Sequence, residues 1–166
     1  MIAIADTTPL ISLLKIGKLD LLNELFGKVY IPRAVFGELT RNSLFVSEAQ
    51  EVKNCEYIEV IEVEDKKSVG ILRRATGLDA GESEAIILTE EQQGNILLMD
   101  EMKGRTVAKQ MGIKIMGTIG ILMIALEKRK ITYSEIVQSI DILRDSGRHI
   151  KNELYEELLK AAEKFR

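Results

Sequence analysis

The stretch ILLMDEMKGRTVAKQMG, residues 96–112, places Asp100 directly after four apolar residues, Ile96–Met99. A short apolar run of this kind predicts a strand that is buried on both faces, and the residues after it have the composition of a helix. The chain begins in the same way, because IAIA, residues 2–5, runs directly into Asp6. Two buried strands that each end in an acid and continue into a helix favour a parallel sheet.

Strands and helices alternate along most of the remaining chain. Further strands are expected in KVYIP (28–32) and GIKIMG (112–117), and further helices at 7–14, where Pro9 suits the first turn, and at 18–26, 33–42, 79–94, 118–130, 131–147 and 151–166. Between residues 43 and 77 the pattern is weaker, and it favours a helix at 47–55 and an extended segment at 56–65. The alternation predicts an α/β sandwich around a mainly parallel sheet. We expect one domain at residues 1–130 and a helical extension at 131–166, packed on or beside it.

The composition excludes several classes of protein. The chain has 166 residues, of which 46% are hydrophobic and 30% charged, as expected for one folded core. A single cysteine, Cys55, and a single histidine, His149, leave no internal disulfide, no zinc site and no Ser-His-Asp or Cys-His centre. We expect His149 to lie in a solvated loop. The net charge of −3 argues against a protein that coats duplex DNA by bulk attraction.

The first residues, MIAIADTTPLISLL, do not resemble a signal peptide, because they lack a basic first region. Asp6 also interrupts the apolar run long before it reaches the length that spans a bilayer. We therefore expect a cytoplasmic protein with no membrane partner.

Asp6 and Asp100 are the first candidates for a functional site. In open parallel sheets, ligands bind beyond the carboxyl ends of the strands, which is where both acids are expected. A carboxylate after a strand is also a common helix cap, so either residue taken alone fits a structural role. Glu38 lies in an expected helix, where a glutamate is unremarkable. Glu82 follows Asp79 at the spacing of a capping box, and this role is as plausible as a functional one.

Carboxylates that converge on one crevice repel each other, and a bound cation offsets the repulsion. Oxygen ligands without histidine or cysteine favour Mg²⁺ or Mn²⁺. Such an ion lowers the pKa of a bound water and can align it for attack on a phosphodiester. The acids therefore indicate metal-dependent hydrolysis with no protein nucleophile.

Five motifs in this order carry a resemblance to a known family: IADTTPLI, IPRAVFGEL, GLDAGESEAIIL, ILLMDEMKGRTVAKQMG and GTIGIL. Together, over roughly residues 2–130, they resemble the PIN domain family and, within it, the prokaryotic DUF3368-type branch that is associated with toxin–antitoxin systems. The resemblance implies a three-layer α/β/α fold. It also implies a Mg²⁺- or Mn²⁺-dependent endoribonuclease that cleaves single-stranded RNA, acts as the toxin of such a pair and has an antitoxin protein as a partner.

Carried over residue by residue, the resemblance makes Asp6, Glu38, Glu82 and Asp100 the catalytic and metal-binding acids. Thr8 matches the small hydroxyl residue that follows the first acid. The third position holds a glutamate, Glu82, where aspartate is more usual, and its longer side chain can still reach a metal. Two neighbouring acids, Glu84 and Glu101, are candidates to share the site. Two basic residues near the expected crevice, Lys103 and Arg105, are candidates for contacts with RNA phosphates, although a solvated helix face explains them as well.

Three alternatives remain open. A phosphatase of the haloacid-dehalogenase type also begins with a strand that ends in Asp, but it places a second Asp two positions later, where this chain has Thr8. A receiver-like regulatory domain lacks its expected paired acids here. A PIN-like binding module without activity would need none of the four acids. The tail helices offer a surface for a second copy of the chain or an antitoxin, or they pack on their own core.

Overall fold

The computed structural model describes all 166 residues and contains one five-stranded sheet. The strands are β1 (Ile2–Ala5), β2 (Lys28–Pro32), β3 (Ile58–Ile61), β4 (Ile96–Leu98) and β5 (Ile115–Met116). Their order is β3-β2-β1-β4-β5, and every neighbouring pair is parallel. The chain therefore adds β2 and β3 on one side of β1 and then β4 and β5 on the other side. The point at which the strand order reverses, the switch point of the sheet, lies between β1 and β4.

Helices follow the strands in the order expected for parallel connections. They are α1 (Thr7–Lys15), α2 (Leu21–Phe26), α3 (Arg33–Arg41), the 3₁₀ turn η1 (Ser43–Phe45), α4 (Val46–Asn54), α5 (Lys66–Thr76), α6 (Ala80–Glu91), α7 (Met102–Gln110), α8 (Thr118–Glu127), α9 (Tyr133–Asp145) and α10 (Asn152–Glu163). None of them combines the length and the apolar character that a membrane span needs.

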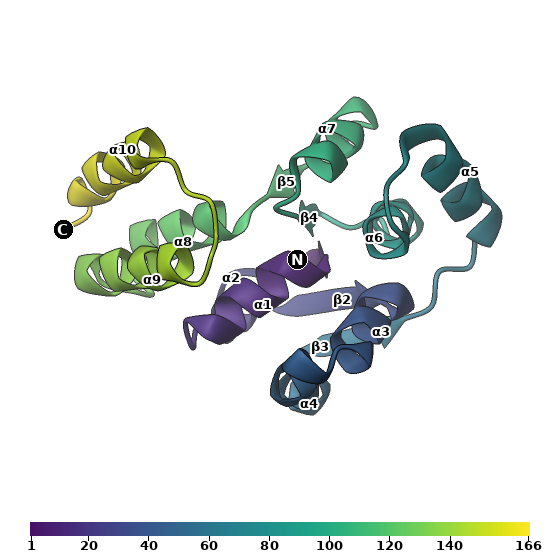
Figure 1. Cartoon of the computed structure of the whole chain (residues 1–166), viewed down its shortest axis with the longest axis horizontal. Coiled ribbons are helices and arrows are strands. Elements are labelled where there is room, and N and C mark those ends of the chain that lie inside the picture. The colour runs from purple at the N-terminus through teal and green to yellow at the C-terminus, as the bar shows by residue number, and fades with distance from the viewer.

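Both faces of the sheet are covered, which makes the fold a three-layer α/β/α sandwich (Figure 1). Alternate residues of β1 show this directly, because Ala3 and Ala5 belong to one buried cluster and Ile4 to the other. The first cluster joins the sheet to the side of α1, α2 and α8, and the second joins it to α5, α6 and α7. The expected fold class is confirmed, and the sheet is parallel throughout.

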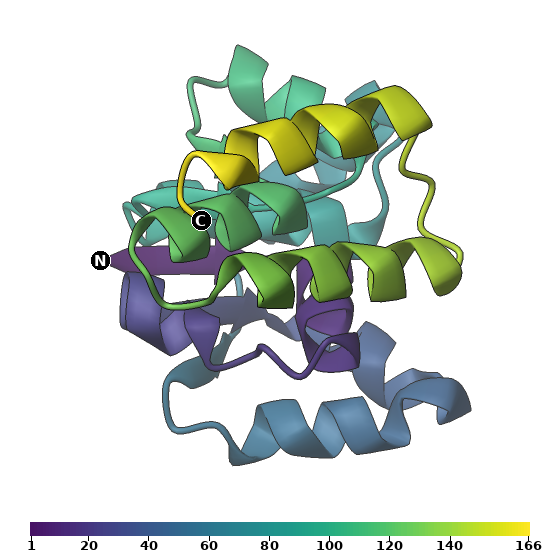
Figure 2. The same ribbon diagram turned by 90° about the vertical axis from the view of Figure 1, so that its left-hand side faces the viewer.

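The two tail helices share the larger buried cluster. Ile136, Ile140 and Leu143 of α9 lie in it together with Leu158 and Ala162 of α10. Figure 2 shows α8, α9 and α10, in green to yellow, crossing the same face of the molecule. The loop between α9 and α10 leads back from this face toward the carboxyl ends of the strands, and its contacts there are described below.

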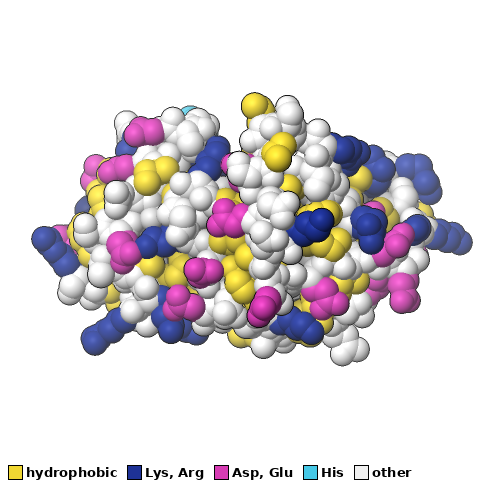
Figure 3. Space-filling model, turned by 90° about the horizontal axis from the view of Figure 1, so that it is seen from below, with side chains coloured by type: hydrophobic (Ala, Val, Ile, Leu, Met, Phe, Trp, Pro, Cys, Tyr) yellow, Lys and Arg dark blue, Asp and Glu magenta, His cyan; other side chains and the backbone are white.

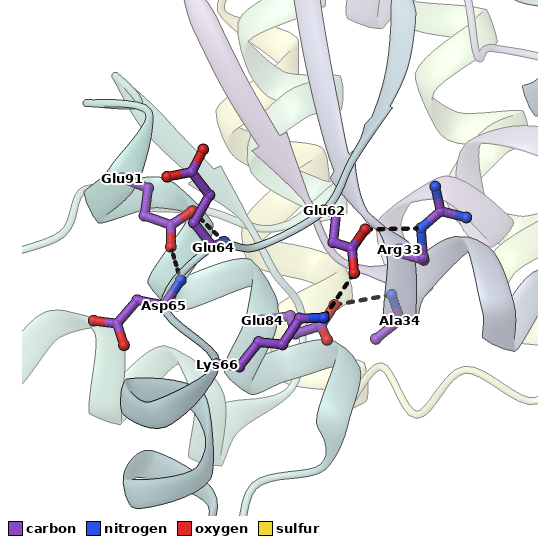
Figure 4. Close-up of polar contacts among 8 residues, drawn as sticks. All are labelled: Arg33, Ala34, Glu62, Glu64, Asp65, Lys66, Glu84 and Glu91. Atoms are coloured by element: carbon purple, nitrogen blue, oxygen red, sulfur yellow. Dashed lines mark hydrogen bonds and ion pairs between the residues drawn. The ribbon is translucent and has the colours of Figure 1, made fainter.

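The segment from residue 43 to 77 contains one helix that the sequence did not predict. The helix at 47–55 and the extended segment at 56–65 are found as α4 and β3, but α5 is additional. Val69 is its one buried residue, and Leu72 is partly buried on the same face. Asp65 begins the helix by accepting a hydrogen bond from Ser68 N at 2.9 Å. Glu91 of α6 holds the entry to α5, because it accepts hydrogen bonds from the backbone of Glu64 and Asp65 (Figure 4).

Candidate active site

Asp6 and Asp100 lie beyond the carboxyl ends of the adjacent strands β1 and β4. The register pairs Ala5 with Leu98, and Asp6 N donates a hydrogen bond to Leu98 O at 3.0 Å. The two acids therefore flank the switch point of the sheet, where open α/β sheets bind their ligands. This is the placement that the apolar runs before each acid predict.

Asp6 is the most perturbed acid of the site. Its side chain is buried, with 5% of its surface exposed. Burial raises the pKa of Asp6 from 3.8 to about 7; the Thr7 backbone N–H opposes the shift, and the negative charges of Glu38, Asp79 and Glu82 add to it. At neutral pH this carboxyl is close to half protonated unless a positive charge is supplied.

Glu38 reaches the same crevice from α3. Thr7 Oγ1 donates a hydrogen bond to Glu38 Oε2 at 2.6 Å. Partial burial raises the pKa of Glu38, the charge of Asp79 adds to the shift, and the Thr7 hydroxyl and Arg41 oppose it. On its other side the carboxylate lies against Gly81 of α6, so closely that a Cβ at this position would overlap Glu38 Oε1. Glycine at position 81 thus makes room for the acid.

Glu82 performs the capping role and also borders the crevice. The capping box is present: Glu82 N donates to Asp79 Oδ1 at 2.8 Å, and Asp79 N donates to Glu82 Oε2 at 3.0 Å. Burial raises the pKa of Glu82, and the charges of Asp79, Glu101 and Glu38 raise it further. Because only Oε2 is used in the cap, Oε1 is left for a ligand. The two interpretations of Glu82 are therefore compatible.

Asp100 is held by residues that the sequence analysis did not select. Thr118, at the start of α8, donates to Asp100 through its backbone N at 2.8 Å and its Oγ1 at 2.6 Å. Arg148 Nη2, from the loop between α9 and α10, lies 2.5 Å from Asp100 Oδ2. Arg148 Nη1 also donates to Ser12 Oγ and to Thr118 Oγ1. A guanidinium thus offsets the charge of Asp100 from a distant part of the chain.

The acids form two groups. Asp6, Glu38 and Glu82 influence one another electrostatically, together with Asp79, whereas Asp100 is paired with Arg148. No three acidic, histidine or cysteine side chains are arranged closely enough to hold one metal ion. The chemistry of the donors nevertheless fits Mg²⁺ or Mn²⁺, because all are carboxylate oxygens and three have a raised pKa that a cation would lower.

The structure separates the remaining candidates. Glu84 accepts a hydrogen bond from Ala34 N at 2.9 Å, at the start of α3 and beside the ion pairs of Glu62 with Arg33 and Lys66 (Figure 4). Glu101 is exposed near Glu82 and contributes to its raised pKa. Thr8 is exposed, and the hydroxyl that contacts an acid of the site belongs to Thr7.

The two basic candidates differ as well. Arg105 Nη1 donates to Met99 O at 2.9 Å and so supports the end of β4. Lys103 is exposed, and its Nζ lies close to Gly77. His149 is exposed in the loop after α9, as expected for a solvated residue.

Two comparisons with known proteins bear on this geometry. No curated protein matches the chain significantly. A family model does match it, over residues 2–164, and this family is DUF3368, described as a PIN domain. The match extends through α9 and α10, beyond the motifs that end near residue 130. PIN domains have a nuclease-type fold, and the chain belongs to the DUF3368 family of PIN domains.

Proposed function

We propose that the chain is a Mg²⁺- or Mn²⁺-dependent endoribonuclease that cleaves single-stranded RNA in the cytoplasm. The observation that carries the proposal is the position of Asp6 and Asp100 at the switch point, with Glu38 and Glu82 brought beside Asp6 by α3 and α6. The resemblance to toxin-associated PIN domains supports a further proposal, that the enzyme is the toxin of a toxin–antitoxin pair and is controlled by an antitoxin protein.

The four acids would supply oxygen ligands for one or two cations, and Thr7 and Thr118 orient two of these acids. A bound Mg²⁺ or Mn²⁺ supplies an activated water and stabilises the charge that develops on the phosphate. A positive charge beside Asp6 would favour its ionised form, because its pKa is raised mainly by burial and further by neighbouring carboxylates. Lys103 is exposed on the first turn of α7 and would contact a phosphate of the RNA.

The test is cleavage of an end-labelled single-stranded RNA by the purified chain in Mn²⁺ and in EDTA. Asp100→Asn should abolish the Mn²⁺-dependent cleavage while circular dichroism shows a folded protein. Glu84→Gln is the matched control, because Glu84 lies nearby in the chain but contacts α3 instead of the crevice. Cleavage that persists in Asp100→Asn would refute the assignment. Hydrolysis of a phosphomonoester with intact RNA would favour a phosphatase, and a wild type that cleaves neither substrate would favour a binding module.

A second prediction concerns the fit between Gly81 and Glu38. Gly81→Ala should leave the fold intact or stabilise it by up to about 1 kcal/mol, since alanine favours a helix over glycine. The new Cβ would displace the flexible end of Glu38, and a misplacement of about 1 Å at a reacting site can lower the rate on the order of 100-fold. Gly70→Ala, in α5, provides the control, with gained helix stability and unchanged cleavage. Thermal unfolding and initial cleavage rates measure both effects, and normal cleavage by Gly81→Ala would remove Glu38 from the mechanism.

A further inference from the structure

A groove opens beside the acids on the side of α3 and η1. It has a volume of about 560 Å³ and is lined by Thr7, Glu38, Arg41, Asn42, Ser43 and Phe45. This volume falls within the roughly 300–1,000 Å³ of pockets that hold small organic ligands. Thr7 and Glu38 belong both to the groove and to the crevice, so a chain that reaches the acids can continue into the groove. We call it the Phe45 groove.

The lining residues offer three kinds of contact at once. Arg41 is exposed and lies close enough to Glu38 to lower the pKa of that acid, and its Nε donates to Gly37 O at 3.1 Å. This bond fixes the guanidinium along α3 and leaves its terminal nitrogens without a protein acceptor. Asn42 uses Oδ1 to accept a hydrogen bond from Leu44 N, so its amide nitrogen is also available. Phe45 is half-buried and provides an aromatic surface.

The three kinds of contact match the three parts of one nucleotide. The guanidinium of Arg41 suits the phosphate, the neutral hydrogen-bond donors suit the sugar, and the ring of Phe45 suits the base. Single-stranded nucleic acids bind proteins through such combinations, in which backbone phosphates meet basic side chains and bases stack on aromatic rings. The chain has few aromatic residues, but one ring beside the acids is enough for one base. Figure 3 shows acidic and basic side chains interspersed over the face seen from below, with no continuous basic track there. This face therefore offers RNA no broad basic surface.

Two other cavities do not share this position. The larger, of about 470 Å³, is lined by residues of α9 and by Arg166, and its lining includes none of the four acids. The other has a volume of about 390 Å³, and its lining residues precede β4 and β5: Thr89, Glu90, Gln93, Gly94, Asn95, Gly112, Ile113 and Lys114. It thus lies at the amino ends of the strands, at the edge of the sheet opposite the acids. Its lining contains neither an arginine nor an aromatic residue. A ligand bound there cannot reach Asp6 or Asp100.

We propose that the Phe45 groove binds one nucleotide of single-stranded RNA next to the phosphate that is cleaved. The base lies against Phe45, and the phosphate on its far side meets Arg41. This inference rests on the proposed function and adds to it the position at which the protein contacts a base. A preference for particular bases would then arise at this nucleotide, through Phe45, Asn42 and Ser43.

The experiment measures binding of a fluorescein-labelled single-stranded RNA to the full chain by fluorescence anisotropy in EDTA, where metal-dependent cleavage does not occur. Phe45→Ala should weaken binding about 5- to 150-fold, which corresponds to the roughly 1–3 kcal/mol of one stacked base. Phe45→Leu keeps the apolar bulk without the aromatic ring and should bind as weakly, whereas Phe45→Tyr should restore binding. A purely structural role of Phe45 would not separate leucine from tyrosine. Phe165→Ala, at an exposed phenylalanine after α10, is the control.

Arg41 is tested through the salt dependence of binding. Arg41→Gln should reduce the slope of log K against log salt by about 0.7, the value for one phosphate contact on a single strand. Lys128→Gln removes one exposed positive charge just after the end of α8 and should leave the slope unchanged.

RNA binding within twofold of wild type in both Phe45→Ala and Arg41→Gln would overturn the proposal. If such variants instead lost only the binding of a co-expressed antitoxin chain, the groove would be a protein interface, which also overturns it. The proposed nuclease function is judged separately, because it depends on Mn²⁺-dependent cleavage by wild type and its loss in Asp100→Asn. Wild-type cleavage together with normal binding by the groove variants would refute this inference alone.

Discussion

Asp6→Asn is expected to abolish RNA cleavage and, in the absence of divalent cations, to make the protein more stable at pH 8 than the wild type. The pKa of Asp6 is about 7 in the folded protein and 3.8 as its ordinary value. Between these values the folded state binds more protons than the unfolded state, so the free energy of unfolding falls as the pH rises from about 4 to 7. Above pH 7 the wild type carries the full destabilisation, about 4 kcal/mol for this difference in pKa.

Asparagine cannot ionise, so this pH dependence should disappear in the variant. The difference in the free energy of unfolding between the variant and the wild type should vanish near pH 4. Urea unfolding in EDTA at pH 4.5, 6 and 8 measures the effect. Glu84→Gln is the control and should keep the wild-type profile, because Glu84 lies outside the crevice. An Asp6→Asn profile that falls with pH as steeply as that of the wild type would contradict the prediction.

Mn²⁺ provides an independent measurement on the same pair of proteins. A cation that binds only the folded state at 100 times its Kd stabilises that state by about 2.7 kcal/mol. We expect this gain in the wild type and its loss in Asp6→Asn. Equal stabilisation of both proteins would place the cation elsewhere on the molecule.

Arg148→Ala is the second substitution for which we expect a large effect, on both stability and Mn²⁺ affinity. The guanidinium and Asp100 are both mostly buried, with side-chain exposures of 21% and 13%. Removing Arg148 takes a charged hydrogen bond from Asp100 and leaves its carboxylate unpaired, which should lower the free energy of unfolding by about 2–3 kcal/mol in EDTA. The same change should increase the affinity for Mn²⁺, because the guanidinium and a cation compete for the oxygens of Asp100.

A double-mutant cycle with Asp100→Asn isolates this pair. In the Asp100→Asn background, Arg148→Ala should cost much less stability, because the charged partner is already absent. Arg166→Ala is the control, since its pair with Glu163 is exposed and should contribute less than about 1 kcal/mol. Isothermal titration with Mn²⁺ completes the test. Unchanged Mn²⁺ affinity in Arg148→Ala would show that the two positive charges do not compete.

The sequence predicted the parts of the fold that have a strong local pattern. The apolar runs before Asp6 and Asp100 became adjacent buried strands, and the helix with Glu38 formed where it was expected. Helix α5 was missed because it buries little apolar surface and is held partly by Glu91, which is distant in the chain.

The residues of the site also divide into those with a local sequence signal and those without one. Asp6 and Asp100 could be selected from their place after strands, whereas Glu38 and Glu82 needed the family resemblance, since both lie in helices where a glutamate is common. Thr118 and Arg148 were not selected at all. Thr118 follows a short strand and begins a helix, which is a detectable position for a polar ligand. Arg148 lies in a polar loop and has no local signal, because its role arises only when that loop reaches Asp100.

The position of Arg148 also bears on the order in which the protein is completed during synthesis. Strands β1 and β4 can pair once residue 98 is available, but the charge of Asp100 has no arginine partner until the chain has been made through residue 148. In a nascent chain the acids of the crevice would therefore lack the positive charge of Arg148. Asp100 would gain its partner only when the loop after α9 packs against it.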